Sequence, residues 1–221
     1  MSPRRPAGSH KIGIVVDLVA KASVAVLIVF ALSHPDWARF SDKAMTARAV
    51  AYPILIGSVA AGWVWRRRRK AVRYPALVSL LVTMPFLVDL AGNALDLYDR
   101  IAWFDDGCHF VNWALLTAAV GVALVRAHTL SPVVIAGLCI GFGATTAILW
   151  EIAEFGAFIT KTPERYGLYH DTIGDLALGL LGATAAGAVC AVVAYSQRDS
   201  DHTSPARAKA APNAGTPPLQ R

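Results

Sequence analysis

Residues 47–70 read ARAVAYPILIGSVAAGWVWRRRRK, an apolar run that ends in five consecutive basic residues. A helix needs about 20 predominantly apolar residues to cross the hydrocarbon core of a bilayer, which is roughly 30 Å thick. The run from 47 to 65 is close to that length. Because basic segments beside a span resist translocation, the block at 66–70 is expected to stay in the cytoplasm. This stretch therefore predicts a transmembrane helix whose second end faces inward.

The rest of the chain repeats the pattern of long apolar runs separated by short polar segments. Hydrophobic residues make up 55% of the 221 residues and charged residues 16%, against about a quarter charged in soluble domains. Helices satisfy their own backbone polar groups in lipid, so the sequence predicts an all-α, polytopic integral membrane helical bundle. The six predicted transmembrane helices are residues 12–32, 47–65, 75–95, 107–125, 132–152 and 172–195.

The distribution of Lys and Arg predicts the orientation of this bundle. With the N-terminus inside, the cytoplasmic segments hold most of the basic residues that lie outside the spans, including those at 66–70. We therefore predict an N-in/C-in, multi-pass protein of the cell (inner) membrane, in contact with membrane lipids. Residues 1–11 are expected to form a cytoplasmic N-terminal segment. Residues 196–221, rich in Ala, Pro, Ser and charge, are expected to form a disordered cytoplasmic tail.

Topology also explains the net charge of +6, because the basic residues flank apolar runs. No RNA- or DNA-binding motif surrounds them, so no nucleic-acid partner is expected. For the first run, a cleaved signal peptide is an alternative to a retained helix. Asp17 and Lys21 favour the helix, because signal peptides have shorter, uncharged apolar regions and residues four apart can pair on a helix.

Small residues inside the spans indicate helix packing. The cysteines Cys108, Cys139 and Cys190 are widely spaced and lie within or beside apolar runs, which is typical of core residues and not of a disulfide framework. Glycines allow two helices to approach closely in a membrane. The glycines interpreted in this way are those at positions 137, 141, 174, 179, 182 and 187.

Acidic residues and histidines gather at the outward-facing ends of the later spans. They are spaced three or four residues apart within each segment, which places side chains on one face of a helix. Those at helix starts and loop ends are also explained, one by one, as solvated caps. His109, Glu151, Glu154 and Asp175 lie deeper in apolar sequence. The full set is Asp96, Asp99, Asp105, Asp106, His109, Glu151, Glu154, His170, Asp171 and Asp175.

Ionisable groups in a span cost at least about 2.5 kcal/mol each at the membrane centre, so they tend to persist where they pair or bind something. A divalent metal cation would neutralise this set: carboxylates with imidazole suit Zn, Mn or Fe, and oxygen ligands alone suit Mg or Ca. The catalytic candidates are Glu151, Glu154 and Asp175. The candidate metal ligands are Asp106, His109, Glu151, Glu154, Asp171 and Asp175.

Three hypotheses about function remain open. The first is a metal-assisted membrane enzyme that acts at the outer face on a lipid-linked or cell-envelope substrate. The second is a small transporter in which Asp17, Lys21 and Asp89 continue a polar path inward. The third is a non-catalytic envelope or partner-binding protein, in which the polar cluster is a hydrogen-bonded network that fixes the register of the helices.

Three motifs, in order, resemble a known family. Residues 105–110 (DDGCHF) open one predicted helix, residues 150–155 (WEIAEF) close the next, and residues 170–176 (HDTIGDL) precede Gly182. This order, over about residues 76–195, resembles the YjdF-like family of bacterial inner-membrane proteins, which has no assigned biochemical function. It is distantly similar to VanZ-like proteins, which are linked to low-level glycopeptide tolerance. The resemblance implies a polar signature at Asp106, His109, Glu151, Glu154, Asp171 and Asp175, and it departs from the family at Gly179, where Asp or Asn is implied.

Overall fold

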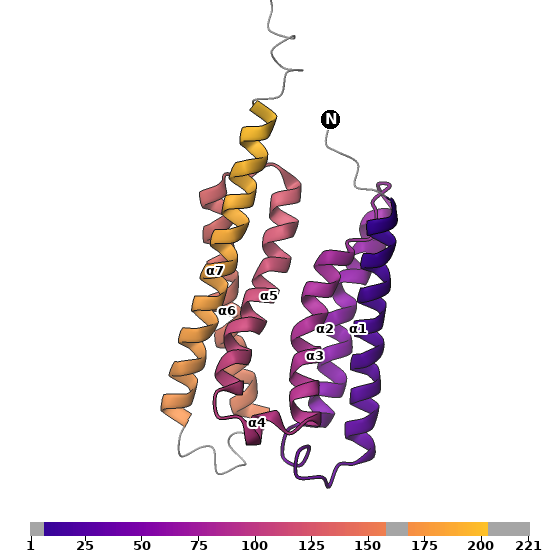
Figure 1. The fold of residues 1–221 in the computed structure, drawn as a ribbon, viewed down its shortest axis with the longest axis vertical. Coiled ribbons are helices and arrows are strands. Elements are labelled where there is room, and N and C mark those ends of the chain that lie inside the picture. Colours follow the sequence, from indigo (N-terminus) through magenta and orange to yellow (C-terminus); the bar gives the residue numbers. More distant parts are fainter. Residues whose placement is uncertain (1–6, 158–167, 203–221) are drawn as a thin grey trace, which may run out of the picture.

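A computed structural model describes residues 7–157 and 168–202, which fold into a bundle of long helices (Figure 1). Six of the described helices are long and apolar enough to cross a membrane, which confirms the predicted number of spans. The remaining described helix, α4, is a single turn in the loop between α3 and α5. The helices are α1 (Ala7–Ser33), α2 (Met45–Arg67), α3 (Ala76–Ala94), α4 (Leu97–Arg100), α5 (Phe104–Ala127), α6 (Pro132–Ala157) and α7 (Leu168–His202).

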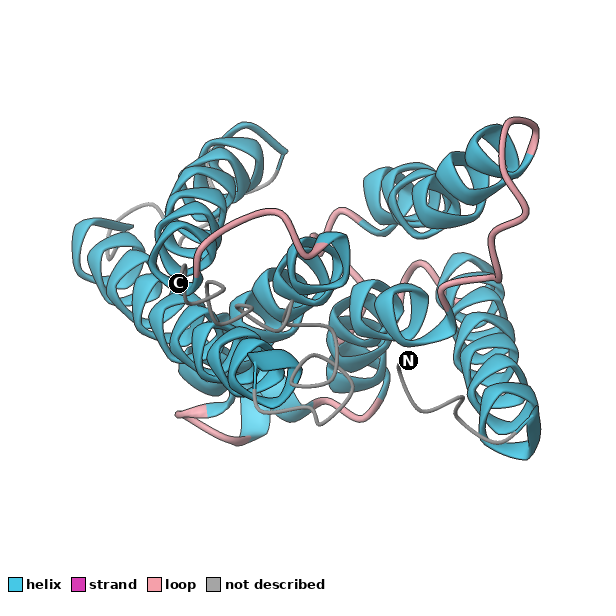
Figure 2. Ribbon diagram, turned by 90° about the horizontal axis from the view of Figure 1, so that it is seen from above, coloured by secondary structure: helices cyan, strands magenta, loops and turns pink. Residues whose placement is uncertain are grey.

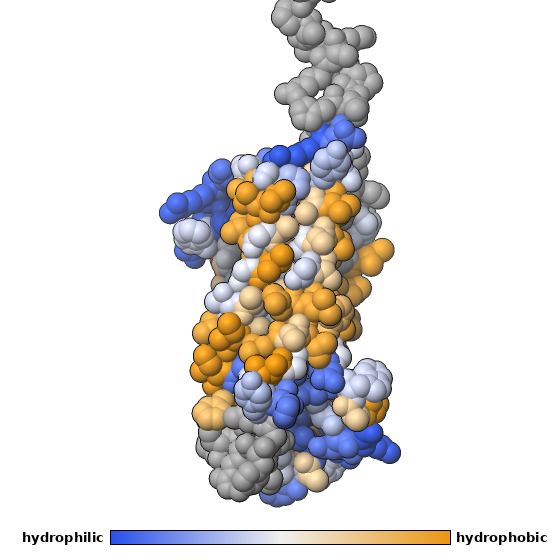
Figure 3. Space-filling model, turned by 90° about the vertical axis from the view of Figure 1, so that its left-hand side faces the viewer, coloured by the Kyte–Doolittle hydropathy of each residue, from blue (hydrophilic) through white to orange (hydrophobic). Residues whose placement is uncertain are grey.

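The surface of the bundle has the polarity of a membrane protein. Figure 3 shows a broad hydrophobic band between two hydrophilic ends, on the face where α6 and α7 lie. Large apolar side chains of these two helices, such as Val133, Val189 and Val192, are exposed. Contiguous apolar surface of this extent is unusual on a soluble monomer, and it is the normal surface of a helix bundle in lipid.

The helices form two groups of three, which the end-on view in Figure 2 separates. In one group α1 packs on α3, with α2 at the edge; in the other, α7 packs extensively on both α5 and α6. The contact between α3 and α5 joins the groups. All three cysteines are buried free thiols, and Cys139 and Cys190 pack in an apolar cluster of the second group, which confirms their interpretation as core residues.

The start of α1 and the end of α7 lie at the same end of the bundle, opposite α4 (Figure 1). An even number of spans requires this arrangement. That this end of the bundle faces the cytoplasm stays a prediction. Most of the long helices extend beyond the predicted boundaries, with α1 beginning at Ala7 and α7 continuing to His202, whereas α3 is one residue shorter at each end. Arg198 Nη2 donates a hydrogen bond to the Leu130 carbonyl at 2.6 Å, which ties this polar extension to the α5–α6 loop. The rest of the predicted tail, residues 203–221, lies outside the described residues.

Glycines bring α7 close to its neighbours at three of the six predicted positions. A Cβ at Gly182 would overlap the Phe110 carbonyl of α5, and one at Gly179 would lie 2.7 Å from Cδ1 of Trp113. Gly187 is similarly close to α6. The indole beside Gly179 leaves no space for the Asp or Asn of the family pattern. The packing interpretation is wrong for the glycines at 137, 141 and 174 as far as residues 7–157 and 168–202 are concerned, because a Cβ there would meet none of their atoms within 4 Å.

Gly182 gives a direct test of this packing. We expect Gly182→Ala to lower the free energy of unfolding by about 1–3 kcal/mol, because the atoms that face position 182 belong to the backbone of α5 and cannot rotate away. Gly174→Ala on the same helix is the matched control, and it is expected to change stability by no more than about 0.5 kcal/mol. Unfolding in mixed micelles measures both variants. Equal stability of the two would contradict the close approach of α5 and α7.

Candidate functional site

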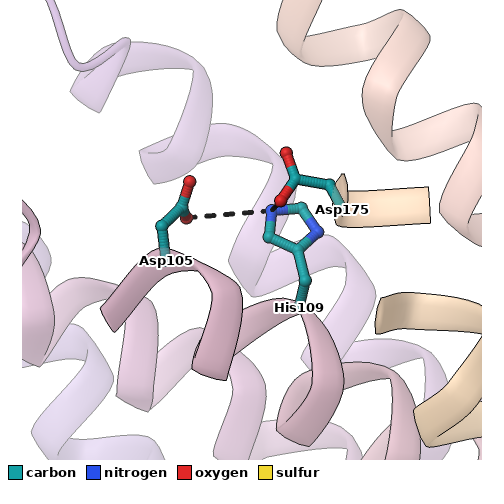
Figure 4. Close-up of side chains that lie close together, drawn as sticks. All are labelled: Asp105, His109 and Asp175. Carbon is teal, nitrogen blue, oxygen red and sulfur yellow. Dashed lines mark ion pairs between the residues drawn. The ribbon is translucent and has the colours of Figure 1, made fainter. Parts of the chain in front are cut away.

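A histidine surrounded by carboxylates lies at the end of the bundle that carries α4. His109, one turn into α5, is 8% exposed. Its Nε2 lies 3.7 Å from Oδ1 of Asp105 and 3.5 Å from Oδ1 of Asp175. Its Nδ1 lies 3.7 Å from Oε1 of Glu151. Figure 4 shows Asp105 and His109 on successive turns of α5, with Asp175 reaching toward the ring from another helix.

Local helix geometry and helix packing together position these side chains. Asp105 lies in the first turn of α5, where the helix dipole favours an acid, and it precedes His109 by four residues on the same face. Asp175 lies in the second turn of α7, which the close contacts at Gly179 and Gly182 hold against α5. Glu151 comes from the last turns of α6. The site therefore depends on three helices that meet at one end of the bundle.

The donor atoms form two groups of three that share the histidine. Asp105, His109 and Asp175 form one group, and His109, Glu151 and Glu154 form the other. In each group the donor atoms lie within 4.8 Å of one another. Bonds of about 2.0–2.6 Å to a divalent cation place its ligands up to about 4–5 Å apart. Both groups therefore fit a divalent cation with at most small side-chain rotations.

Two features of the site favour a ligand. Nδ1 of His109 is buried and has no hydrogen-bond partner within the described residues, since the oxygen at 3.7 Å is too distant. A buried polar atom without a partner costs about 1–3 kcal/mol. In addition, neither Glu151 nor Asp175 has a Lys or Arg at ion-pair distance within residues 7–157 and 168–202. A bound cation would offset the negative charge of these carboxylates.

A second polar cluster adjoins the histidine site. Arg48 of α2 donates from Nε to Oδ2 of Asp89 on α3 at 3.0 Å, and its Nη2 lies 3.9 Å from Oε1 of Glu154. The same Asp89 accepts hydrogen bonds from the Tyr52 hydroxyl at 2.6 Å and from the Tyr98 hydroxyl at 3.2 Å. Burial and the charge of Asp89 raise the pKa of Tyr98 above its usual value, so this phenol stays a proton donor. Asp89 thus joins the polar end of the bundle.

Most of the candidate ligands meet at this site. His109, Glu151, Glu154 and Asp175 belong to the two ligand groups, whereas Asp106 and Asp171 lie at the same end of their helices but in neither group. Asp105, explained from the sequence as a cap, is a member. The sequence signal that could have identified Asp105 as a ligand is its spacing of four residues from His109.

Arg48 is a site residue that the sequence analysis did not single out. It lies at the start of the predicted span 47–65, and an ionisable residue in such a place calls for a partner. Asp89 is that partner. The predicted ion pair between Asp17 and Lys21 is confirmed, with Nζ of Lys21 2.7 Å from Oδ2 of Asp17.

Comparison with known proteins gives one match. A family model described as "Predicted membrane protein (DUF2238)" matches residues 17–196, which include all six spans in large part. No curated protein and no solved structure matches the chain. The distant similarity to VanZ-like proteins that the motifs suggested is not supported by a match. Because the family model covers most of the chain, this protein belongs to the DUF2238 family of predicted membrane proteins.

Proposed function

We propose that this protein binds a divalent cation through Asp105, His109 and Asp175 at the extracytoplasmic face of the cell membrane, and that it acts there on a lipid-linked or envelope substrate. The observation that carries the proposal is that donor atoms of Asp105, His109 and Asp175, which come from two helices, lie within 4.8 Å of one another. The resemblance to the YjdF-like family agrees with the family match and adds no reaction to it.

The cation belongs on the Nε2 side of His109. The Asp105 side chain on that side is 47% exposed, which leaves open positions for water and substrate. On the Nδ1 side, the guanidinium of Arg48 lies 3.9 Å from Glu154 and would repel a cation. Ligating histidines commonly donate their other ring N–H to a carboxylate. In this arrangement Nδ1 carries the proton and Glu151, now at 3.7 Å, accepts it in a hydrogen bond.

Such a site suits hydrolysis or group transfer. A divalent cation supplies Lewis-acid activation of water or of a substrate oxygen. Glu151 lies behind the ring, where it orients His109, and Glu154 is held toward Arg48. In Figure 3 the apolar band borders a hydrophilic region at each end of the bundle. A substrate anchored in lipid would therefore place its polar group at the level of such a hydrophilic end, where the histidine site lies.

The two other hypotheses are less well supported by the geometry. A hydrogen-bonded network is present around Asp89, whereas the contacts of His109 with its carboxylates are 3.5–3.7 Å long and exceed hydrogen-bond length. A transport path from Asp17 to Asp89 would have to pass the Tyr52 and Phe86 rings, whose centroids are 4.6 Å apart. Tyr52 and Phe86 both belong to a buried apolar cluster, which separates the two polar ends of α3.

Elemental analysis tests the proposed site. The protein purified in mild detergent without chelator is expected to contain about one divalent cation per chain, and EDTA is expected to lower its melting temperature, because a ligand that binds only the folded state stabilises it. Readdition of Zn²⁺ or Mn²⁺ should restore the melting temperature. A metal-free preparation whose melting temperature responds to neither EDTA nor added cation would refute the proposal.

A further inference from the structure

A groove of about 650 Å³ runs between α1 and α2, and none of its lining residues belongs to the histidine site. Its walls are almost entirely apolar and extend from Ile14 to Ile28 on α1 and from Pro53 to Trp63 on α2. At 1.5 Å per residue these segments are about 15–20 Å long. That length is similar to the depth of one leaflet, about half of the 30 Å hydrocarbon core.

The groove is hollow because the facing residues are small. Ala25 of α1 and Gly57 and Ala60 of α2 line it. A Cβ at Gly57 would meet no atom of the described part of the chain within 4 Å, so none of its side chains occupies the space beside this glycine. The packing between α1 and α2 is much less extensive than that between α5 and α7.

Lys21 lines the groove, but its ammonium group already donates to three acceptors within the protein. The Lys21 ammonium donates to Asp17 at 2.7 Å, to the Tyr74 hydroxyl at 2.8 Å and to the Ser79 hydroxyl at 2.7 Å. These three bonds use its three donors. Its methylene stem is therefore the part available to the groove, and an anion must find its partners elsewhere.

Those partners lie at one end of the groove. The Trp63 indole, which lines the groove, donates to the Val72 carbonyl at 3.0 Å and packs edge-on against Tyr74. The guanidinium of Arg67 lies 4.7 Å from the Trp63 ring centroid. Around it the basic residues 66–70 and Arg73 are exposed. Tryptophan and tyrosine beside exposed basic residues are typical of the headgroup region, where basic clusters attract anionic lipids.

We propose that this groove binds one anionic phospholipid, with an acyl chain between α1 and α2 and the phosphate beside Arg67 and its basic neighbours. The length and apolar walls of the groove match the acyl chain, and the exposed cations at its end match the headgroup. The lipid fills the space that Gly57 leaves and completes the packing of α2 against α1. This binding is independent of the histidine site at the other end of α2.

Lipid retention in native mass spectrometry tests the proposal. Wild-type protein is reconstituted in nanodiscs of equal parts phosphatidylglycerol and phosphatidylcholine, then released from them. It is expected to retain one phosphatidylglycerol per chain. Gly57→Leu, which fills the groove, should lower this retention about tenfold, because the acyl chain loses its packing surface. Gly62→Leu on the same helix is the matched control, since position 62 is also open but does not line the groove.

Two further measurements keep the result interpretable. Ala25→Leu fills the groove from α1 and should reproduce the loss if Gly57→Leu does not fold. Replacing Arg67 and Arg68 by Gln should abolish the preference for phosphatidylglycerol over phosphatidylcholine. Undiminished retention in a folded groove-filling variant, or equal retention of the two lipids by the wild type, would overturn the proposal.

Discussion

Asp175→Asn is expected to lower the affinity for a divalent cation by at least about 100-fold, because loss of a ligand exceeds the 10- to 100-fold cost of losing a partner of a ligand. Asp175 Oδ1 lies 3.5 Å from Nε2 of His109 and belongs to the more exposed ligand group. Asparagine keeps the size of the side chain and removes its charge, so the helix packing is retained. Isothermal titration of the chelated protein with Zn²⁺ or Mn²⁺ measures the change.

The neighbouring acids give matched controls for this experiment. Asp171→Asn alters the same helix one turn earlier, and Asp171 is in neither ligand group. Asp106→Asn is likewise the control for Asp105→Asn. Both controls are expected to bind the cation within about threefold of the wild type, through loss of long-range charge only. A larger loss in Asp106→Asn or Asp171→Asn than in Asp105→Asn or Asp175→Asn would assign the ligands to the other acids.

Asp89→Asn is expected to destabilise the fold by about 3–5 kcal/mol, since removing one partner of a buried ion pair leaves the other charge uncompensated. Arg48, 3.0 Å from Asp89, would keep the longer, 3.9 Å contact to Glu154 and would remain buried. The hydroxyls of Tyr52 and Tyr98 would also lose a charged acceptor. Unfolding in mixed micelles, monitored by circular dichroism, measures the loss.

A surface pair in the same region is the control. Lys43 and Asp99 are 3.1 Å apart, and the Asp99 side chain is 55% exposed. Exposed pairs contribute about 0–1 kcal/mol, so Asp99→Asn should be nearly neutral. The double substitution Arg48→Met with Asp89→Leu is expected to recover most of the stability, because it removes both charges together. The ion pair would not be a structural centre if Asp89→Asn were as mild as Asp99→Asn.

The candidate site was partly predictable because its residues are close in sequence within each helix. Spacing along α5 and α6 is local information, so the pairing of His109 with an acid one turn away and the position of Glu151 near a helix end follow from the periodicity. The choice of Asp105 over Asp106 depends on which face of α5 meets α7. Asp171 and Asp175 share one face of α7, so the choice between them depends on how far along α7 the two helices meet. Two adjacent carboxylates have the same composition and the same dipole preference, so a pattern in one helix cannot separate them.

The six membrane helices follow directly from the residue pattern, since the length and apolarity of each run decide whether it can cross a bilayer. The same pattern also determined that ionisable residues gather at one end. Only the tertiary structure decided the partners: Arg48 with Asp89, His109 between α6 and α7, and the hollow beside Gly57. These contacts join residues far apart in the chain, and they follow from the rotation of each helix about its axis, which side-chain packing between helices sets.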